Sequence, residues 1–371
     1  MKARRIAVLL QSLDGGGAQR RTVELANGFV AQGRAVDLLL VEPGDDLQGK
    51  VASAVRITRL GSDPICQLAD YLKREQPDAL LAGAAAIHDI AVAAVAKHPG
   101  TPLILRASSH PLRHFPWSMP RQRLRELFRR RARLRRYAAA DLIIAVAADV
   151  GEALRRALPS ARVEVIANPV VNPAFLADAD AAIKLPWPPD ETIPLIVGIG
   201  RFALAKDFPT LIRAFGLLRE TRPAHLAILG DGSPRERAAL EKLVRRFGLE
   251  ADIALPGVTP HVAAWLSRAN LFVSSSLWEG SPGALIEALA MGCPVVATNS
   301  VGTARDLLAD PRLGALVPPS DPRAMAKAMA AVLDRPVNRA ALVAAAKPFA
   351  TGGRAADNLA AIDRCVAGRR E

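Results

Sequence analysis

Residues 271–298 read LFVSSSLWEGSPGALIEALAMGCPVVAT, the pattern of a strand, a loop, a helix and a second strand. An apolar run leads into a loop that is rich in serine and glycine. The helix is expected to have Ser281 as its N-cap and Pro282 at its first position, and to end just before Gly292. A second apolar run follows at once. This order predicts two parallel strands of one sheet.

The same alternation of short apolar runs with amphipathic helical stretches continues along the whole chain. Strands are expected in a first series at 6–10, 36–41, 79–81, 103–105, 142–145 and 163–166, and in a second series at 193–199, 225–229, 253–255, 271–274 and 295–297. Such alternation is typical of the α/β class, in which doubly wound parallel sheets bind ligands at the carboxyl ends of their strands.

The two series of strands are separated at 178–192 by charged residues and three prolines, a composition typical of a linker. We therefore expect an N-terminal Rossmann-like domain at 1–177 and a C-terminal Rossmann-like domain at 193–351. Two such domains that face each other form a central cleft.

The composition excludes several classes of protein. Three cysteines, Cys66, Cys293 and Cys365, match no metal or redox motif, and their odd number argues against a disulfide framework. The histidines also lack metal-ligand spacing, so no metal site is expected.

The apolar stretch 79–96 is mostly alanine and is interrupted by charge, which makes it a poor membrane span. The run 6–10 has no cleavage site after it and is expected to be a strand, not a signal peptide. The expected compartment is the cytoplasm.

Lys and Arg outnumber Asp and Glu by 49 to 36, which gives a net charge of +13. Such a surplus attracts nucleic acid, anionic lipid or phosphorylated ligands. Nine arginines lie at 121–136 with apolar residues interspersed near helical spacing. A basic amphipathic helix often lies on anionic lipid; a solvated face and a nucleic-acid patch are the alternatives. Because aromatic stacking platforms are scarce, no nucleic-acid partner is expected.

The start of the helix within 271–298 has the features of a phosphate site. The N–H groups of Gly283 and Ala284, with Leu285 on the same turn, are expected to bind a nucleotide phosphate. Glu287 lies on the same helix face as Gly283 and can accept hydrogen bonds from ribose hydroxyls. Glu279 lies in the loop before the helix, where it can face a sugar. The alternative is two solvated carboxylates.

The stretch 279–298 resembles the most specific motif of the family-4 retaining glycosyltransferases, E-G-x-P-x-x-L-x-E-A-x-A-x-G-x-P-V-V-A-T. The resemblance implies that Glu279 contacts the donor sugar and that Glu287 contacts the ribose of the nucleotide. It also adds weight to the phosphate site at the helix start.

A second stretch, 200–215, reads GRFALAKDFPTLIRAF and resembles the family element G-R-x-x-x-x-K-x-x-x-x-L-I-x-A-F. Arg201 and Lys206 follow the end of a strand in this stretch. Fixed cations there can stabilise the negative charge that develops on a departing nucleoside diphosphate, without a metal. The alternative is that both are ordinary surface cations.

Three further stretches resemble less specific elements of the family. Gly230 begins a turn similar to the family's G-x-G turn near the nucleotide, although a capped helix after a strand needs no ligand. Gly16 and Gly17 match the family's G-G-A-E-R element and can approach a phosphate or sugar, or simply form a tight turn. His110 resembles a histidine that contacts the donor sugar in some members; the alternative is an ordinary loop histidine.

The resemblance covers nearly the whole chain and implies the GT-B architecture. In that architecture the domain at 193–351 binds the nucleotide sugar and the domain at 1–177 binds the acceptor. A last helix over 352–371 is expected to return to the first domain. Helices similar to the arginine-rich one support membrane docking in the family, so Arg129, Arg130, Arg131 and Arg133 are expected at a membrane or acceptor surface.

The implied reaction is metal-independent hexosyl transfer, with retention of anomeric configuration, from a UDP- or GDP-linked sugar to a saccharide or lipid-linked acceptor. The enzyme is expected to need no cofactor, to serve cell-surface polysaccharide or glycolipid synthesis, and to associate with the inner face of the cytoplasmic membrane. Two alternatives stay open: a nucleotide-sugar epimerase or phosphorylase of the same fold, and a non-catalytic basic protein that binds anionic polymers or membranes.

Overall fold

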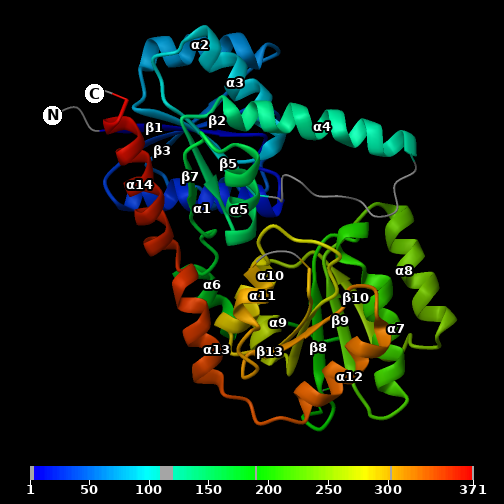
Figure 1. Ribbon diagram of the computed structural model, residues 1–371. Helices are drawn as coiled ribbons and strands as arrows, with labels where there is room; N and C mark the ends of the chain where they lie inside the picture. The colour runs from blue at the N-terminus through cyan, green and yellow to red at the C-terminus, as the bar shows by residue number, and fades with distance from the viewer. Residues whose placement is uncertain (1–3, 109–119, 189, 301–302, 370–371) are drawn as a thin grey trace. The chain divides into compact units, whose positions relative to one another are not determined.

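The structure is a computed structural model that describes residues 4–108, 120–188, 190–300 and 303–369, with the backbone alone at 120–127. The chain forms two compact units. The first consists of Met1–Pro169 together with Thr351–Glu371, and the second of Val170–Ala350 (Figure 1). Each unit has its own parallel sheet, so the doubly wound α/β fold class is confirmed.

The first unit is built on a seven-stranded parallel sheet with the order β3-β2-β1-β4-β5-β6-β7. Its strands are β1 (Arg5–Leu10), β2 (Ala35–Leu40), β3 (Val55–Arg59), β4 (Ala79–Ala82), β5 (Leu103–Ala107), β6 (Leu142–Ala145) and β7 (Val163–Val165). The inner strands are buried on both faces, which is why they are nearly continuous apolar runs.

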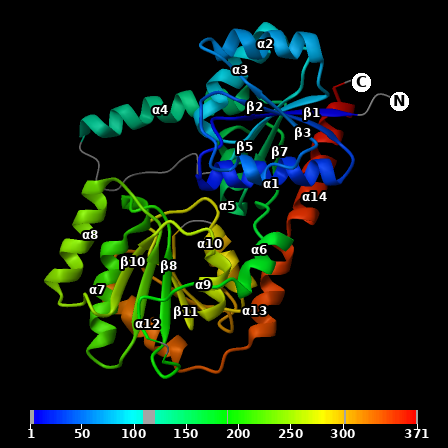
Figure 2. The ribbon, with the colours of Figure 1, turned by 180° about the vertical axis from the view of Figure 1, so that it is seen from behind.

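Helices cover both faces of this sheet. One face packs against α1 (Gly17–Ala31) and α14 (Thr351–Ala367). The other face packs against α2 (Pro64–Glu75), α3 (His88–Lys97), α4 (Pro120–Ala138) and α5 (Ala148–Ala157). The carboxyl-terminal helix α14 lies beside α1 in both ribbon views (Figures 1 and 2), so the last segment of the chain completes the core of the first unit.

The second unit has a six-stranded parallel sheet with the order β10-β9-β8-β11-β12-β13. Its strands are β8 (Leu195–Ile199), β9 (His225–Leu229), β10 (Ile253–Gly257), β11 (Leu271–Ser274), β12 (Val295–Thr298) and β13 (Gly314–Val317). Its helices are α6 (Pro173–Ala177), α7 (Phe208–Arg219), α8 (Pro234–Arg246), α9 (Val262–Arg268), α10 (Gly283–Ala290), α11 (Thr303–Leu307), α12 (Pro322–Leu333) and α13 (Arg339–Ala346). Helices α7, α8 and α12 share one apolar core with the sheet.

Two strands were not expected from the sequence, β3 and β13, and each forms an edge of its sheet. In β3, Arg56 and Thr58 alternate with Val55 and Ile57, because one side of this edge strand is exposed. In β13 the four residues start at a glycine and are too short to give a clear pattern. Edge strands bury less apolar surface and therefore have a weaker sequence signal.

The segment after Pro169 belongs to the second unit, whereas the sequence places the first domain up to 177 and a linker at 178–192. The backbone N–H groups of Val170 and Val171 donate to the carbonyl of Phe349, at 2.9 and 3.1 Å. Further on, Asp178 Oδ1 lies 2.7 Å from Nδ1 of His261, the N-cap residue of α9. These contacts attach the expected linker to the second unit.

The expected helix boundaries are largely reproduced. Ser233 and Glu236 form the expected capping box of α8. Gly292, after α10, has the positive φ of 71° that a helix-ending glycine adopts. At the start of α10 the expectation is wrong by one residue. Pro282 is the N-cap, with a non-helical ψ of 71°, and the Ser281 side chain caps nothing. Helix α10 therefore begins at Gly283.

Candidate active site

The candidate site lies at the carboxyl edge of the second sheet. Strands β8 and β11 are neighbours, and Phe272 of β11 pairs with Val197 of β8, so both strands end at the same level. The loop after β8 contains the short 3-10 helix η4 (Leu204–Lys206), and the loop after β11 contains Glu279. Two stretches that are some seventy positions apart in sequence therefore meet at one edge.

Lys206 and Glu279 are in direct contact at this edge. Lys206 Nζ lies 2.8 Å from Glu279 Oε1, and the two side chains are 25% and 13% exposed. The hydroxyls of Ser276 and Ser274 donate to the same oxygen, at 2.5 and 3.3 Å. Within the described part of the chain, Glu279 Oε2 has no hydrogen-bond partner. The Ser274 hydroxyl also lies 3.3 Å from Oγ of Ser276, so its single proton is shared between that oxygen and Glu279 Oε1. Oε1 is thus held by Lys206 and Ser276, with a weaker contact from Ser274, and Oε2 is open to a ligand hydroxyl.

Hydrogen bonds to backbone carbonyls fix the two loops to each other. The Ser275 hydroxyl donates to the carbonyl of Lys206 at 2.6 Å, and the Leu277 N–H donates to the carbonyl of Ala205 at 2.8 Å. The Thr298 hydroxyl, at the end of β12, donates to the Ser276 carbonyl. The loops after three strands are therefore one connected structure. The sequence motifs did not single out these hydroxyl residues, although three serines in a row at a strand end were a signal.

Glycines at the ends of β8 and β9 allow this arrangement. A Cβ on Gly200 would lie 2.8 Å from Cε of Lys206, because the lysine stem passes directly over this glycine. A Cβ on Gly230 would lie 2.1 Å from the carbonyl oxygen of Gly200. Close approach of the two loops is thus sufficient to explain a glycine at 230, without a donor nucleotide.

Arg201 is exposed and makes no ion pair or side-chain hydrogen bond among the described residues. Its charge acts on Glu236, whose pKa is held below its usual value mainly by hydrogen bonds from the N–H and hydroxyl of Ser233, with a smaller effect of Arg201. The Arg201 guanidinium is therefore available to an anionic ligand at the carboxyl edge of the sheet.

The start of α10 retains part of its expected capacity to bind a phosphate. The Gly283 N–H donates to the Ser281 carbonyl at 2.9 Å, so this amide is already engaged, contrary to expectation. The amides of Ala284 and Leu285 lie in the first turn, where N–H groups have no intrahelical acceptor. Glu287 is only 4% exposed, much more deeply buried than Glu279.

In the first unit, the glycine-rich loop joins β1 to α1. Gly16 is the N-cap of α1 and has no side chain to cap the helix, and a Cβ on Gly17 would meet no atom within 4 Å. The space at Gly17 is thus open, as a site for a phosphate or sugar requires. His110 lies outside the described residues. The positions of the two units relative to each other are not determined, so the expected cleft is not described.

The residues Arg129, Arg130, Arg131 and Arg133 lie on α4 of the first unit. Phe128, next to them, is 62% exposed. The carboxyl-terminal end of α4 is fixed to α3, because Arg136 forms an ion pair of 2.5 Å with Asp89 and Tyr137 is buried.

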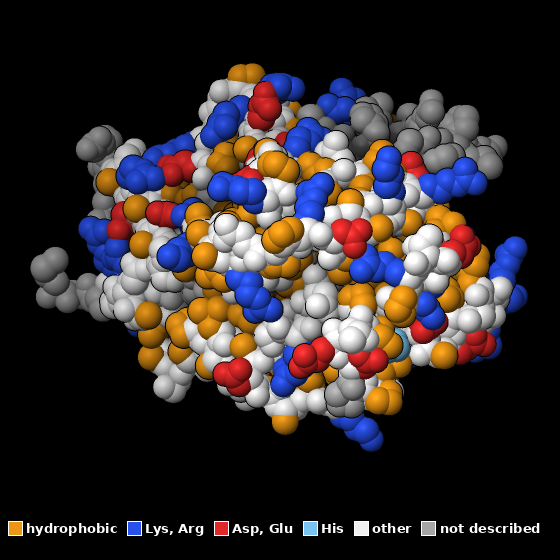
Figure 3. All heavy atoms as spheres, turned by 90° about the horizontal axis from the view of Figure 1, so that it is seen from below, with side chains coloured by type: hydrophobic (Ala, Val, Ile, Leu, Met, Phe, Trp, Pro, Cys, Tyr) orange, Lys and Arg blue, Asp and Glu red, His pale blue; other side chains and the backbone are white. Residues whose placement is uncertain are grey.

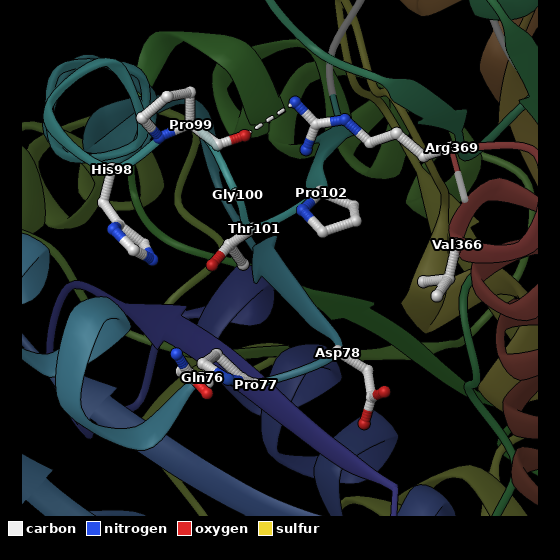
Figure 4. Close-up of a pocket in the computed structure, with 10 residues that line it drawn as sticks. All are labelled: Gln76, Pro77, Asp78, His98, Pro99, Gly100, Thr101, Pro102, Val366 and Arg369. Carbon is white, nitrogen blue, oxygen red and sulfur yellow. Dashed lines mark hydrogen bonds between the residues drawn. The ribbon is translucent and has the colours of Figure 1, made fainter. Parts of the chain in front are cut away.

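A cavity of about 540 Å³ lies in the first unit, at the edge of the sheet where its strands begin (Figure 4). Its lining includes residues just before the first residues of β4 and β5, such as Asp78 and Pro102, and Arg369 reaches across it to donate to the Pro99 carbonyl at 2.9 Å. Ligands of doubly wound sheets bind at the carboxyl edge, so this amino-edge cavity is separate from the candidate site. No group of three metal-ligating side chains is present within the described residues. Nor is any described helix both long and apolar enough to span a bilayer.

Two family models match the chain: Glycosyltransferase Family 4 over residues 15–171 and Glycosyl transferases group 1 over residues 193–335. The lipopolysaccharide core biosynthesis glycosyltransferase LpsE of Rhizobium meliloti is 26% identical over 295 residues, which cover 77% of each chain. The uncharacterized glycosyltransferase MJ1059 of Methanocaldococcus jannaschii is 36% identical over 115 residues, 31% of this chain and 28% of that one. The shared part is thus less than a third of the length of MJ1059.

The crystal structure of HepE from Anabaena in complex with UDP-glucose has the same fold, with a TM-score of 0.75, 18% identity, and coverage of 96% of this chain and 99% of that one. Two Rossmann-like units with this carboxyl-edge site define a glycosyltransferase of the GT-B fold. The chain belongs to glycosyltransferase family 4, the group-1 glycosyl transferases.

Proposed function

We propose that the protein transfers a hexosyl unit from a UDP- or GDP-linked sugar to a saccharide or lipid-linked acceptor, with retention of anomeric configuration and without a metal or cofactor. The observation that carries the proposal is the contact of Lys206 with Glu279. A cation suited to a phosphate lies beside a carboxylate suited to a sugar hydroxyl. The names of LpsE and of the HepE complex support a nucleotide-sugar donor and a role in lipopolysaccharide or polysaccharide synthesis.

In this proposal, each group at the carboxyl edge of the second sheet has one task. Lys206 and Arg201 stabilise the charge that grows on the leaving diphosphate, because fixed cations need no reorganisation during the reaction. The amides of Ala284 and Leu285 bind the same diphosphate at the positive end of α10. Glu279 accepts a hydrogen bond from the sugar through Oε2, and Glu287 accepts one from the ribose.

The proposed chemical step balances without a nucleophilic side chain. The bond between the anomeric carbon and the phosphate oxygen breaks, and the acceptor oxygen bonds to the same face of the sugar. The acceptor proton passes to the leaving phosphate oxygen. In this proposal the first unit binds the acceptor.

We further propose that α4 rests on the inner face of the cytoplasmic membrane and brings the enzyme to a lipid-linked acceptor. Exposed Phe128 beside exposed Arg129 and Arg131 has the chemistry of an interfacial helix, an apolar side chain among cations. Sedimentation with vesicles tests this. Binding is expected with vesicles that contain anionic lipid and not with neutral ones, and replacement of these two arginines by glutamine should weaken it. Equal binding to neutral vesicles would contradict the proposal.

The donor proposal is tested by isothermal titration calorimetry of the protein with UDP, GDP and their hexose conjugates, with and without EDTA. Binding of one nucleotide series that survives EDTA is expected. NMR of the product then reports its anomeric configuration, which should equal that of the donor. No binding of either series would overturn the proposal, and inversion would overturn the retaining mechanism.

The same binding and activity measurements distinguish two other functions from the proposed one. An epimerase or phosphorylase of this fold would convert the nucleotide sugar or a glycan without the acceptor. A binder of anionic polymers would bind no nucleotide sugar and would show a steep salt dependence. On the face seen in Figure 3, basic side chains lie among acidic and apolar ones.

A further inference from the structure

We propose that Ser276 is a positioning residue for Glu279. It holds Oε1 beside Lys206 and so keeps Oε2 free to accept from the sugar, and Ser274 assists it. This inference rests on the proposed function. The Ser276 hydroxyl donates to Glu279 Oε1 at 2.5 Å, and Ser274 donates to the same atom at 3.3 Å. Both bonds go to the oxygen that also contacts Lys206, and neither goes to Oε2.

The first consequence concerns the carboxylate. A carboxylate that is held by a single ion pair can rotate and offer both oxygens to the cation. The Ser276 hydroxyl on Oε1 adds direction, because hydrogen bonds to an ionised group are short and oriented, and Ser274 adds a weaker contact. Oε2 is then kept available to accept from a sugar hydroxyl.

The second consequence concerns the cation. The serine hydroxyls are neutral and do not change the balance of charge between Glu279 and Lys206. Its ammonium group has three donors, of which one is used by Glu279 Oε1. The remaining donors are available to a diphosphate, with or without the serine hydroxyls. The serines therefore act on Glu279, and the binding of a nucleoside diphosphate by Lys206 does not depend on them.

The side chain of Ser276 can be changed without breaking the contacts that hold its loop. Ser276 is 1% exposed, so its hydroxyl has no access to bulk water. The bond from the Thr298 hydroxyl is made to the backbone carbonyl of Ser276, and the neighbouring loop contact is made by the Ser275 hydroxyl. Both contacts remain when Ser276 is replaced by alanine. The substitution therefore removes the hydroxyl that contacts Glu279 and, with it, an acceptor 3.3 Å from the Ser274 hydroxyl, and leaves the backbone contacts of the loop in place.

The test compares Ser276→Ala and Ser274→Ala with the unmodified protein and with Ser267→Ala as a matched control. Ser267 lies on α9 of the same unit, and its hydroxyl donates to the Ala179 carbonyl at 2.9 Å. The readouts are the melting temperature, the affinity for the nucleoside diphosphate alone, the affinity for the nucleotide sugar, and kcat.

Ser276→Ala is expected to keep the nucleoside diphosphate affinity of the unmodified protein. It should lose the extra affinity that the sugar provides, together with a factor of about 10 to 100 in kcat, as expected when a hydrogen bond to a charged group is removed. Ser274→Ala, whose bond is longer, should show a smaller effect of the same kind. Ser267→Ala should not change kcat.

Two results would overturn the inference. One is unchanged kcat and sugar-dependent affinity in both serine variants. The other is a parallel fall of nucleoside diphosphate and nucleotide-sugar affinity, which would mean that Ser276 supports the whole loop. These outcomes differ from failure of the proposed function, in which the unmodified protein itself binds neither ligand.

Discussion

The stem of Lys206 passes over the backbone of Gly200 so closely that a Cβ on this glycine would lie 2.8 Å from Cε of the lysine. Gly200 also has a φ of 155°, which side chains rarely adopt. Gly200, the residue after β8, thus leaves the space that the lysine stem occupies. The Lys206–Glu279 pair depends on a residue that contributes no side chain.

Gly200→Ala should therefore displace Lys206 from Glu279 and lower kcat/KM by about 100-fold, the lower end of the range seen when one charge-stabilising contact is lost. The strained φ should also cost about 1–3 kcal/mol of stability. Steady-state kinetics and urea unfolding measure the two effects. Gly216→Ala, on α7, is the control, because its Cβ would meet only an ordinary 3.5 Å contact with Leu249. Normal turnover in Gly200→Ala would show that the pair is not needed.

Arg201→Ala and Glu279→Gln should fold as the unmodified protein does and lose most activity, at a cost of about 3 kcal/mol in the barrier each. Arg201→Ala should weaken the binding of the nucleoside diphosphate itself, whereas Glu279→Gln should weaken mainly the sugar-dependent part. Arg213→Ala removes an exposed arginine of α7 in the same unit and serves as the matched control. The site assignment fails if both site variants turn over normally.

His88 makes stability depend on pH. Burial, with a contribution from the charge of Arg136, lowers the pKa of His88 to about 4, and the side chain is 1% exposed. Unfolded histidine titrates at about 6.5. As the pH falls from 6.5 towards 4, the unfolded chain gains a proton that the folded chain excludes, so the free energy of unfolding falls by about 3 kcal/mol.

Urea titrations at pH 7 and pH 4.5 should show this loss in the unmodified protein. In His88→Gln, which cannot titrate, the decrease between the same two pH values should be smaller. An equal decrease in the two proteins would mean that His88 accepts a proton in the folded state as readily as in the unfolded one.

The last helix should be coupled to the first unit through one close contact. A Cβ on Gly28 of α1 would lie 2.5 Å from Cβ of Ala355 on α14. Gly28→Ala should therefore separate the two helices and destabilise the protein by about 1–3 kcal/mol, although alanine favours a helix over glycine by about 1 kcal/mol. The double variant Gly28→Ala with Ala355→Gly should recover most of the loss. Thermal unfolding that is unchanged in the single variant would refute this packing.

Much of the fold could be predicted because a strand buried on both faces must be apolar along its length. This requirement gave the inner strands of both sheets, such as β9 and β11, to within a few residues. It failed for β3, whose polar residues Arg56 and Thr58 give a mixed pattern, and for β13, whose four residues are too few to give a clear one. It also could not assign the segment after Pro169 to the second unit, because contacts with Phe349 and α9 join positions far apart in the sequence.

The sequence by itself determined the alternation of strands and helices, the family motifs, and the residue types suited to a phosphate and a sugar. Each of these features depends only on residues that are close together in the sequence. Only the tertiary structure decided that Lys206 and Glu279 touch, that Ser274 and Ser276 hold one carboxylate oxygen, and that Gly200 makes room for the lysine. The reason is physical: the carboxyl ends of adjacent parallel strands bring together loops that the chain keeps apart.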